Sequence, residues 1–375
     1  MSHHQIASCV ESRGQWTTCD STYTFTSELV NEATFRLQMY FDPGDTDVRS
    51  YDVDDLAFQL VQSHSDLAPS SGIVVSEAVA HGWGVGAEVL ITSHTLDYED
   101  SQVRTITTIQ DHERAGYVVL GLDTPVVPPT TETVNPDYAV EVALLSRNIV
   151  FMGAGDDQNS RHGGHLIVFK TETPQEIRGV EFRNFGQQGL LGRYVSVAFS
   201  PWNFKPALSY VSTLRIQPIH FHLCEEAEGS VVASNLIRDS NQRCIVIHGT
   251  NNVLVETNVA YQTKGHCFML EDGNEQGNKF VGNLGAATER PESLIPNMGS
   301  NGRETDDQAS TFWITNPSNV WIGNVAAGSE VNGFWFELNP SIRGPNAEQF
   351  RDLNPKKLPL TTFRDNVCHS NRRVS

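Results

Sequence analysis

The sequence predicts an all-β protein whose larger part is a parallel β-helix, preceded by a smaller β-rich and mixed N-terminal region. Two observations carry this prediction. After about residue 147, short apolar runs recur with Asn and Gly between them, and almost nothing has helical spacing. Within that region one short pattern containing Asn returns five times, which is typical of a solenoid built from repeated coils.

Composition restricts the classes of function. The chain has 375 residues and a net charge of −19, with no cluster of Lys and Arg, so a nucleic-acid partner is not expected. No run of about 18 apolar residues occurs, so membrane association is expected only through segments absent from this chain. Six cysteines are too few for a disulfide scaffold.

Residues 1–80 are interpreted as a mixed α/β region. The stretch "VDDLAFQLVQSH", residues 53–64, has helical spacing and predicts a helix. The stretch "DPGDTD", residues 42–47, lacks the spacing and the closing Glu of a calcium loop and is interpreted as a turn. Residues 81–147 contain short strands with Gly and Asp turns, which predict a small barrel or sandwich.

The predicted β-helix occupies residues 148–375 and is marked by the repeated Asn. The gaps between successive Asn residues are 23, 25, 41 and 42 residues, and each long gap is one coil plus an inserted loop, or two short coils. We expect the Asn side chains to stack in a hydrogen-bonded ladder at one turn; they are Asn235, Asn258, Asn283, Asn324 and Asn366. The alternative is an antiparallel sandwich with accidental Asn spacing.

A second register predicts which side chains face inward. Five strands, "IHFH", "IVIHG", "FMLED", "FWIT" and "FWFEL", can be aligned, and alternation puts their first and third residues inside the coil. Those residues are all large and apolar: Ile219, Phe221, Ile245, Ile247, Phe268, Leu270, Phe312, Ile314, Phe334 and Phe336. The second and fourth residues face outward: His220, His222, Val246, His248, Met269, Glu271, Trp313, Thr315, Trp335 and Glu337.

The outward face carries the candidate chemistry. Exposed indoles beside ionisable groups suit a sugar, whose ring stacks on Trp while carboxylates and imidazoles hydrogen-bond to its hydroxyls or exchange protons with them. With rungs about 4.8 Å apart, Glu271 and Glu337 would lie roughly 9–10 Å apart, near the spacing of about 6.5–9.5 Å in inverting glycosidases. The catalytic candidates are Glu271, His248, His222 and Glu337, and the sugar-binding candidates are Trp313, Trp335, His220 and Asp272.

Several alternatives stay open for this face. The His and Glu side chains could form a polar ladder that satisfies itself, and the Trp residues could lie under a loop or a partner domain. Positive charge at Arg193, Arg243 and Lys264 could contact an acidic sugar or be surface charge. A zinc site of His220, His222, His248 and His266 is not favoured, because no Cys/His pattern of familiar spacing accompanies them, so no metal site is predicted.

Two cysteines occupy equivalent positions in neighbouring coils. Cys244 precedes the strand "IVIHG" and Cys267 precedes "FMLED". The spacing allows either a stack of two thiols or a disulfide bond, and the sequence does not choose between them.

Several motifs together resemble a known family. "GRY…PIHFHLC", "RCIVIHGTNNVLV", "GHCFMLEDGNEQGN", "STFWITNPSN" and "GWGVGAEVLITSHTLDYEDSQVRTI" are similar to the cell-migration-inducing, hyaluronan-binding proteins and the related transmembrane cell-surface hyaluronidase, over about residues 81–340. Residues 1–80 resemble that family's lectin-like module only faintly. The resemblance implies a right-handed parallel β-helix, an extracellular or membrane-anchored setting, hyaluronan as partner, and calcium dependence in some members. It supplies no catalytic residues for the β-helix.

The resemblance also marks two departures. The family's glycine-rich domain ahead of this region and a signal or anchor helix are expected to be missing here. In the family pattern Gly-Arg-Tyr leads directly into Pro-Ile-His-Phe-His, whereas here residues 195–217 intervene. We interpret them as an insert or a retained intron. The codons for Val-Ser at the start and for Gln at the end can contain the nucleotide sequences that usually border an intron. The alternative is a surface loop whose Trp202 and Phe204 cover the histidines.

The predicted function is depolymerisation of a hyaluronan-like polysaccharide on the outward face. In hydrolysis Glu271 would be the leading acid or base and Glu337 the second carboxylate. In β-elimination His248 or His222 would be the base, with Arg243 or Lys264 neutralising the uronate. The alternatives are a carbohydrate-binding or adhesion module without turnover, and a structural β-helix with an unrelated partner.

Overall fold

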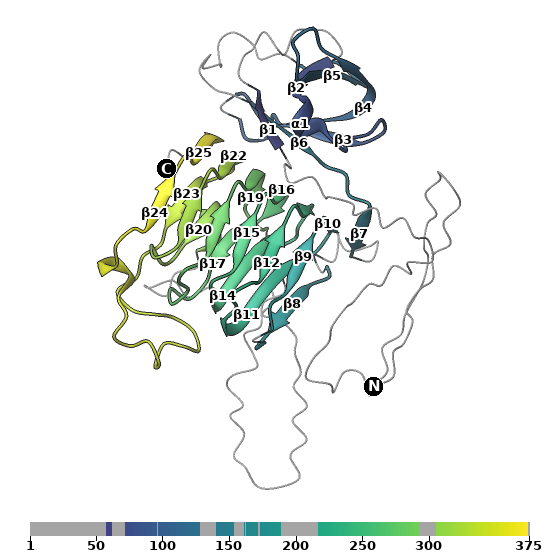
Figure 1. The fold of residues 1–375 in the computed structure, drawn as a ribbon. Helices are drawn as coiled ribbons and strands as arrows, with labels where there is room; N and C mark the ends of the chain where they lie inside the picture. The colour runs from purple at the N-terminus through teal and green to yellow at the C-terminus, as the bar shows by residue number, and fades with distance from the viewer. Residues whose placement is uncertain are drawn as a thin grey trace, which may run out of the picture. The chain divides into compact units, whose positions relative to one another are not determined.

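The computed structural model describes residues 58–61, 72–95, 97–127, 140–153, 161, 163–171, 173–188, 217–292 and 305–373, in which two bodies of β-structure are formed (Figure 1). Side chains are described for these residues except those of 58–61 and Asp306. The predicted elements before residue 58 and nearly all of the predicted insert lie outside the described residues. Within the described residues, no helix is long and apolar enough to cross a membrane.

The first body is an antiparallel sheet with the strand order β1-β6-β3-β4-β5-β2. Its strands are β1 (Phe58–Val61), β2 (Gly72–Ser76), β3 (Glu88–Ile91), β4 (Gln102–Asp111), β5 (Tyr117–Leu122) and β6 (Val140–Leu144), with the short helix α1 (Glu77–Ala80). The prediction of a helix over residues 53–64 is wrong at 58–61, because β1 pairs with β6 there and pairing overrides local spacing. Two strands of this sheet precede residue 81.

The second body is a parallel β-helix, which confirms the predicted fold class. Each complete coil contributes one strand to each of three parallel sheets, named here A, B and C. Sheet A contains β7 (Ile149–Met152), β10 (Val180–Arg183), β13 (Leu236–Arg238), β16 (Val259–Lys264), β19 (Leu284–Glu289), β22 (Val325–Ser329) and β25 (Val367–Asn371). Sheet B contains β8 (Leu166–Phe169), β11 (Ile219–Glu226), β14 (Ile245–Asn251), β17 (Phe268–Leu270), β20 (Ser310–Ile314) and β23 (Asn332–Phe336). Sheet C contains β9 (Glu176–Arg178), β12 (Val231–Ala233), β15 (Leu254–Glu256), β18 (Lys279–Val281), β21 (Val320–Ile322) and β24 (Thr362–Arg364).

The predicted Asn ladder is present at the turn between sheets C and A. Each Asn donates its backbone N–H and its side-chain amide to the Oδ1 of the next Asn along the axis, at 2.9–3.1 Å from Asn235 through to Asn366. In the preceding coil this position belongs to Val180, whose N–H donates to Asn235 Oδ1 at 3.1 Å. A second, shorter ladder joins Asn278 to Asn319, and the sequence analysis missed it.

The coil interior follows the predicted alternation. The first and third residues of the sheet B strands lie in one buried apolar cluster, with Phe334 partly buried, while Phe336 in the last rung is 38% exposed. Each long Asn gap is one coil plus an inserted loop: one loop follows β19 and includes η3 (Asp306–Gln308), and the other follows β23 and includes η4 (Pro355–Lys357). A disulfide bond joins Cys244 to Cys267 on neighbouring rungs.

Candidate functional site

The outward face of sheet B consists of two columns of side chains that run across the strands. The first, called the tryptophan column, contains the second residues: His220, Val246, Met269, Trp313 and Trp335. The second, called the acid–histidine column, contains the fourth residues: His222, His248, Glu271, Thr315 and Glu337. Parallel pairing without a shift at these rungs places equivalent residues side by side, so the predicted columns are confirmed.

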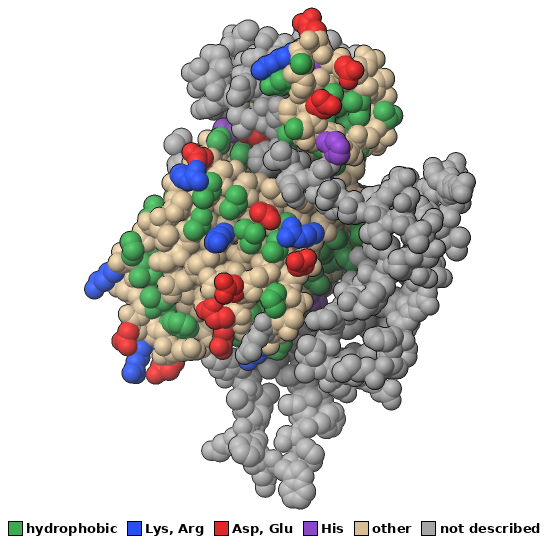
Figure 2. Space-filling model, in the orientation of Figure 1, with side chains coloured by type: hydrophobic (Ala, Val, Ile, Leu, Met, Phe, Trp, Pro, Cys, Tyr) green, Lys and Arg blue, Asp and Glu red, His purple; other side chains and the backbone are tan. Residues whose placement is uncertain are grey.

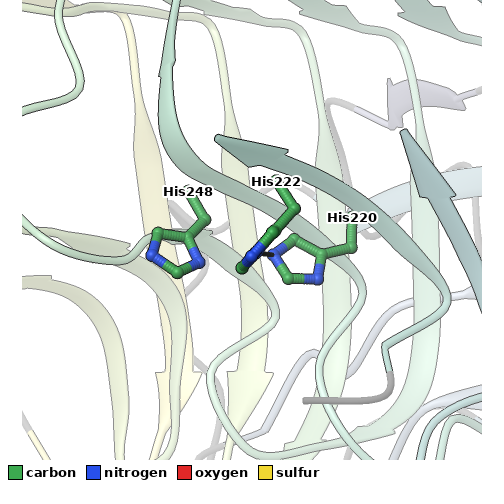
Figure 3. Close-up of side chains that lie close together, drawn as sticks. All are labelled: His220, His222 and His248. Atoms are coloured by element: carbon green, nitrogen blue, oxygen red, sulfur yellow. Dashed lines mark hydrogen bonds between the residues drawn. The ribbon is translucent and has the colours of Figure 1, made fainter. Parts of the chain in front are cut away.

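Three imidazoles meet where the two columns begin. His222 Nδ1 and His220 Nε2 are 3.2 Å apart and share a hydrogen bond, drawn as the dashed line in Figure 3. The His248 ring packs edge-on against His222, with ring centroids 4.5 Å apart, and lies parallel to His220 at 5.7 Å. All three side chains are buried, so their ring nitrogens converge in a nearly dry space.

Two carboxylates flank His248 on opposite sides of its ring. His248 Nε2 is 2.8 Å from Asp272 Oδ2, and His248 Nδ1 is 3.5 Å from Glu271 Oε2. Burial lowers the pKa of His248, but Glu271 and Asp272 outweigh that effect and raise the pKa to about 9. His248 is therefore positively charged at neutral pH and lies between the two acids.

His222 has the opposite electrostatic character. Burial, followed by repulsion from His248, lowers the pKa of His222 to about 3, so its ring is neutral at physiological pH. The ring of Phe169 stacks on it with centroids 5.6 Å apart. Two adjacent imidazoles on one face therefore hold different charge states, which is an arrangement that proton-transfer sites use.

A buried glutamate that the sequence analysis did not single out holds the turn after β17. Glu275 accepts backbone N–H groups from Gly249 and Asp272 at 2.9 Å and from Gly273 at 2.7 Å. Burial and the nearby Asp272 raise the pKa of Glu275. These hydrogen bonds fix the backbone that carries Asp272, so Glu275 positions the acid that orients His248.

The loop after β23 covers this turn. Arg343 N–H donates to Asp272 O at 3.0 Å, and a side chain larger than hydrogen at Gly344, where φ is +66°, would collide with the Asp272 carboxylate. Burial lowers the pKa of Arg343, although Glu337 and three further acids of the site counteract that effect. Arg343 is therefore a second cation of the site, and no periodicity in the sequence could have placed it there.

The tryptophan column is more buried than predicted. Trp313 is 1% exposed and stacks between His266, with ring centroids 3.8 Å apart, and Trp335, with centroids 6.4 Å apart. The prediction that Trp313 is an exposed sugar platform is therefore wrong, and the alternative of a covered indole applies to it. Trp335 is partly exposed and its indole N–H donates to Glu337 Oε2 at 3.1 Å.

The basic candidates do not gather at the columns. Arg243 is fully buried and its guanidinium donates to the sulfur of Met269, so it packs against the tryptophan column and is not open to a ligand. Lys264 ends β16 in sheet A and pairs with Glu292 at 3.5 Å and Glu289 at 3.9 Å. Arg193 lies outside the described residues. Figure 2 shows Lys/Arg and Asp/Glu side chains interspersed over the visible face of the described β-helix.

Fold and site together define a parallel β-helix protein that carries the tryptophan column and the acid–histidine column on the outward face of sheet B. Residues 211–375 match the family model described as CEMIP beta-helix, and this region of the chain belongs to that family. The family resemblance of the sequence is thereby confirmed.

Three curated relatives show how far the likeness extends. The human protein "Cell surface hyaluronidase CEMIP2" is 30% identical over 77% of this chain and 22% of its own length. "Cell surface hyaluronidase" of Danio rerio is 32% identical over 63% of this chain and 18% of its own length. "Cell migration-inducing and hyaluronan-binding protein" of Mus musculus is 32% identical over 64% of this chain and 18% of its own length. The chain thus spans about a fifth of the length of these relatives.

Proposed function

We propose that this chain binds a hyaluronan-type acidic polysaccharide on the outer face of sheet B and cleaves it by hydrolysis. The observation that carries the proposal is the group of Glu271, His248 and Asp272, in which two carboxylates flank one buried, positively charged imidazole. The names of the relatives, which include hyaluronidases and a hyaluronan-binding protein, supply the substrate class.

In this proposal the sugar chain contacts the exposed end of the columns. Trp335 is partly exposed and offers an indole face for a sugar ring, while its N–H fixes Glu337 beside it. Glu271 is the proton-transfer group, because its carboxylate lies next to His248 in a setting that excludes most water. Glu337 supplies the second carboxylate that glycoside hydrolysis requires.

The two basic residues predicted to serve β-elimination do not lie on the open face of the columns, and Arg343 is the cation that the structure places at the site. Elimination needs a cation that neutralises the uronate carboxylate, and Arg243 and Lys264 were the candidates. Arg243 is fully buried against Met269, and Lys264 is paired with two acids beside another sheet. Neither residue is therefore placed to neutralise a uronate on the columns.

Charge predicts that the interaction needs a cation. The chain carries a net charge of −19, and hyaluronan is also an anion, so the two repel each other over long distances. A calcium ion bridging carboxylates of protein and polymer would remove this repulsion, since calcium prefers oxygen ligands. We therefore include calcium as a proposed cofactor of binding.

We infer an extracellular or cell-surface setting for the same site. The Cys244–Cys267 disulfide bond is buried between two rungs of sheet B, and disulfide bonds persist mainly in oxidising compartments. The names of two relatives also state a cell-surface location.

The decisive experiment measures the length of hyaluronan after incubation with the full chain, with and without calcium. Wild type should shorten the polymer, Glu271→Gln should slow shortening about 10²–10⁴-fold, and Glu256→Gln on sheet C should act like wild type. Near-ultraviolet absorbance would reveal the unsaturated uronate of elimination, which we do not expect. A polymer left unchanged by folded wild type in both conditions contradicts the proposed cleavage.

A second candidate, a binding module without turnover, is favoured by the burial of the columns. His222 and His248 are each 6% exposed, which leaves the proton-transfer groups little open to a polymer, whereas Trp335 is partly exposed and still offers an indole face to a sugar ring. This candidate predicts that hyaluronan keeps its length while Trp335→Ala still weakens binding. Measuring binding and chain length on the same samples separates the two functions.

A further inference from the structure

We propose that His220, His222 and His248 form a binding site for one divalent transition-metal ion of the zinc type. One ring nitrogen from each residue lies within 4.8 Å of the other two, and all three residues are buried. Among the described residues, His266 does not join this group; it stacks on Trp313 instead.

One of the three nitrogen–nitrogen distances already matches that of a tetrahedral site. Zinc–nitrogen bonds of about 2.0–2.1 Å place two ligand nitrogens about 3.3 Å apart. His222 Nδ1 and His220 Nε2 are already 3.2 Å apart, so the ion would replace the proton that these two nitrogens share. The ring of His248 lies beside His222 (Figure 3), and one of its nitrogens is within 4.8 Å of the other two ligand nitrogens.

The surroundings of His248 match those of a metal-bound histidine. Its Nε2 is held 2.8 Å from Asp272, which leaves Nδ1 as the nitrogen that can bind an ion. A ligand histidine commonly has its other ring nitrogen hydrogen-bonded to a carboxylate, which fixes the ring and increases its basicity. Within the described part of the chain His248 Nδ1 makes no hydrogen bond, although it is buried.

The ligand type selects the class of metal. Three imidazole nitrogens suit zinc and its neighbours in the first transition row, whereas calcium and magnesium take oxygen ligands. Three protein ligands also leave one coordination position open, as in catalytic zinc sites. Glu271 is the carboxylate beside this group, with Oε2 3.5 Å from His248 Nδ1.

The zinc site shares His248 with the proposed function, but its test does not depend on that function, because metal binding is measured without any polysaccharide. The metal-free full chain, without an affinity tag that contains histidine, is titrated with Zn²⁺ by calorimetry, and the zinc-loaded wild type is examined by X-ray absorption. We expect one zinc per chain that excess Ca²⁺ does not displace, with three imidazole ligands at about 2.0–2.1 Å.

Variants locate the site. His222→Gln and His248→Gln should each weaken zinc binding by at least about 100-fold, and Asp272→Asn by about 10–100-fold. His266→Gln, which removes a buried histidine outside the group, should bind zinc like wild type. Absence of zinc binding by folded wild type overturns the proposal, and so does a spectrum without imidazole ligands, which needs no variant to fold. Wild-type affinity in both His222→Gln and His248→Gln also overturns it.

Discussion

The two columns on sheet B are built by the same strands, two residues apart, and yet they have opposite chemistry. In the tryptophan column, Val246, Met269 and Trp313 pack into a small apolar cluster with Trp335 against it. In the acid–histidine column, His248 lies between two carboxylates and carries a charge. Regular pairing places both sets, and only the side chains differ.

The difference shows how one sheet can be stable and reactive at once. The tryptophan column contributes buried apolar area and close stacking, and both stabilise the fold. The acid–histidine column contains buried charges, whose loss of hydration costs about as much as their mutual attraction returns. We therefore expect the apolar cluster of the first column to determine stability and the second column, together with His220, to determine chemistry. The following variants test that division.

The largest effect should come from the centre of the tryptophan column. Trp313→Ala removes a fully buried indole between His266 and Trp335 and should lower the free energy of unfolding by about 3–5 kcal/mol. Urea denaturation of the full chain measures the change. Trp335→Ala, in the last rung of the same column, should cost clearly less because this side chain is only partly buried. Equal losses of unfolding free energy in the two variants would contradict the inference that burial in the tryptophan column determines stability.

Much of this architecture could be predicted from the sequence because the repeat acts through the backbone. An Asn at one turn satisfies the same backbone group in each coil, so its spacing reveals the ladder from Asn235 to Asn366. Alternation along "IVIHG" and "FMLED" similarly reveals which residues form the columns. The second ladder had a signal as well, since Asn278 and Asn319 each precede a ladder Asn by five residues.

The parts of the site that have no period could not be predicted. Glu275 lies in a turn, and its three hydrogen bonds reach groups brought together only by folding. Arg343 and Gly344 come from a long loop whose contacts with Asp272 depend on its path over the sheet. The burial of Trp313 has the same origin, since a strand pattern states which way a side chain points but not what covers it.

An intermediate effect should come from the covalent link that both columns share. The disulfide bond joins Cys244 and Cys267, each directly before the first residue of its sheet B strand, so it holds the two rungs that carry His248 and Glu271. Replacing both cysteines by Ala should lower the free energy of unfolding by about 3 kcal/mol, given a separation of 23 residues. Cys224→Ala, at a buried cysteine without a disulfide, is the matched control and should cost less. A double variant as stable as the control would contradict a structural role for the bond.

The smallest effect should have the opposite sign and come from the acid–histidine column itself. Thr315 is 1% exposed, and within the described residues its hydroxyl has no hydrogen-bond partner, so Thr315→Val should raise the free energy of unfolding by up to about 1 kcal/mol. Thr311, in the adjoining strand β20, is the matched control because its buried hydroxyl is 3.0 Å from that of Thr288. Thr311→Val should lower the free energy of unfolding by about 1 kcal/mol. Urea denaturation resolves the two signs. If Thr315→Val loses stability like Thr311→Val, the acid–histidine column contains a hydrogen bond to Thr315, and its polar groups contribute to stability after all.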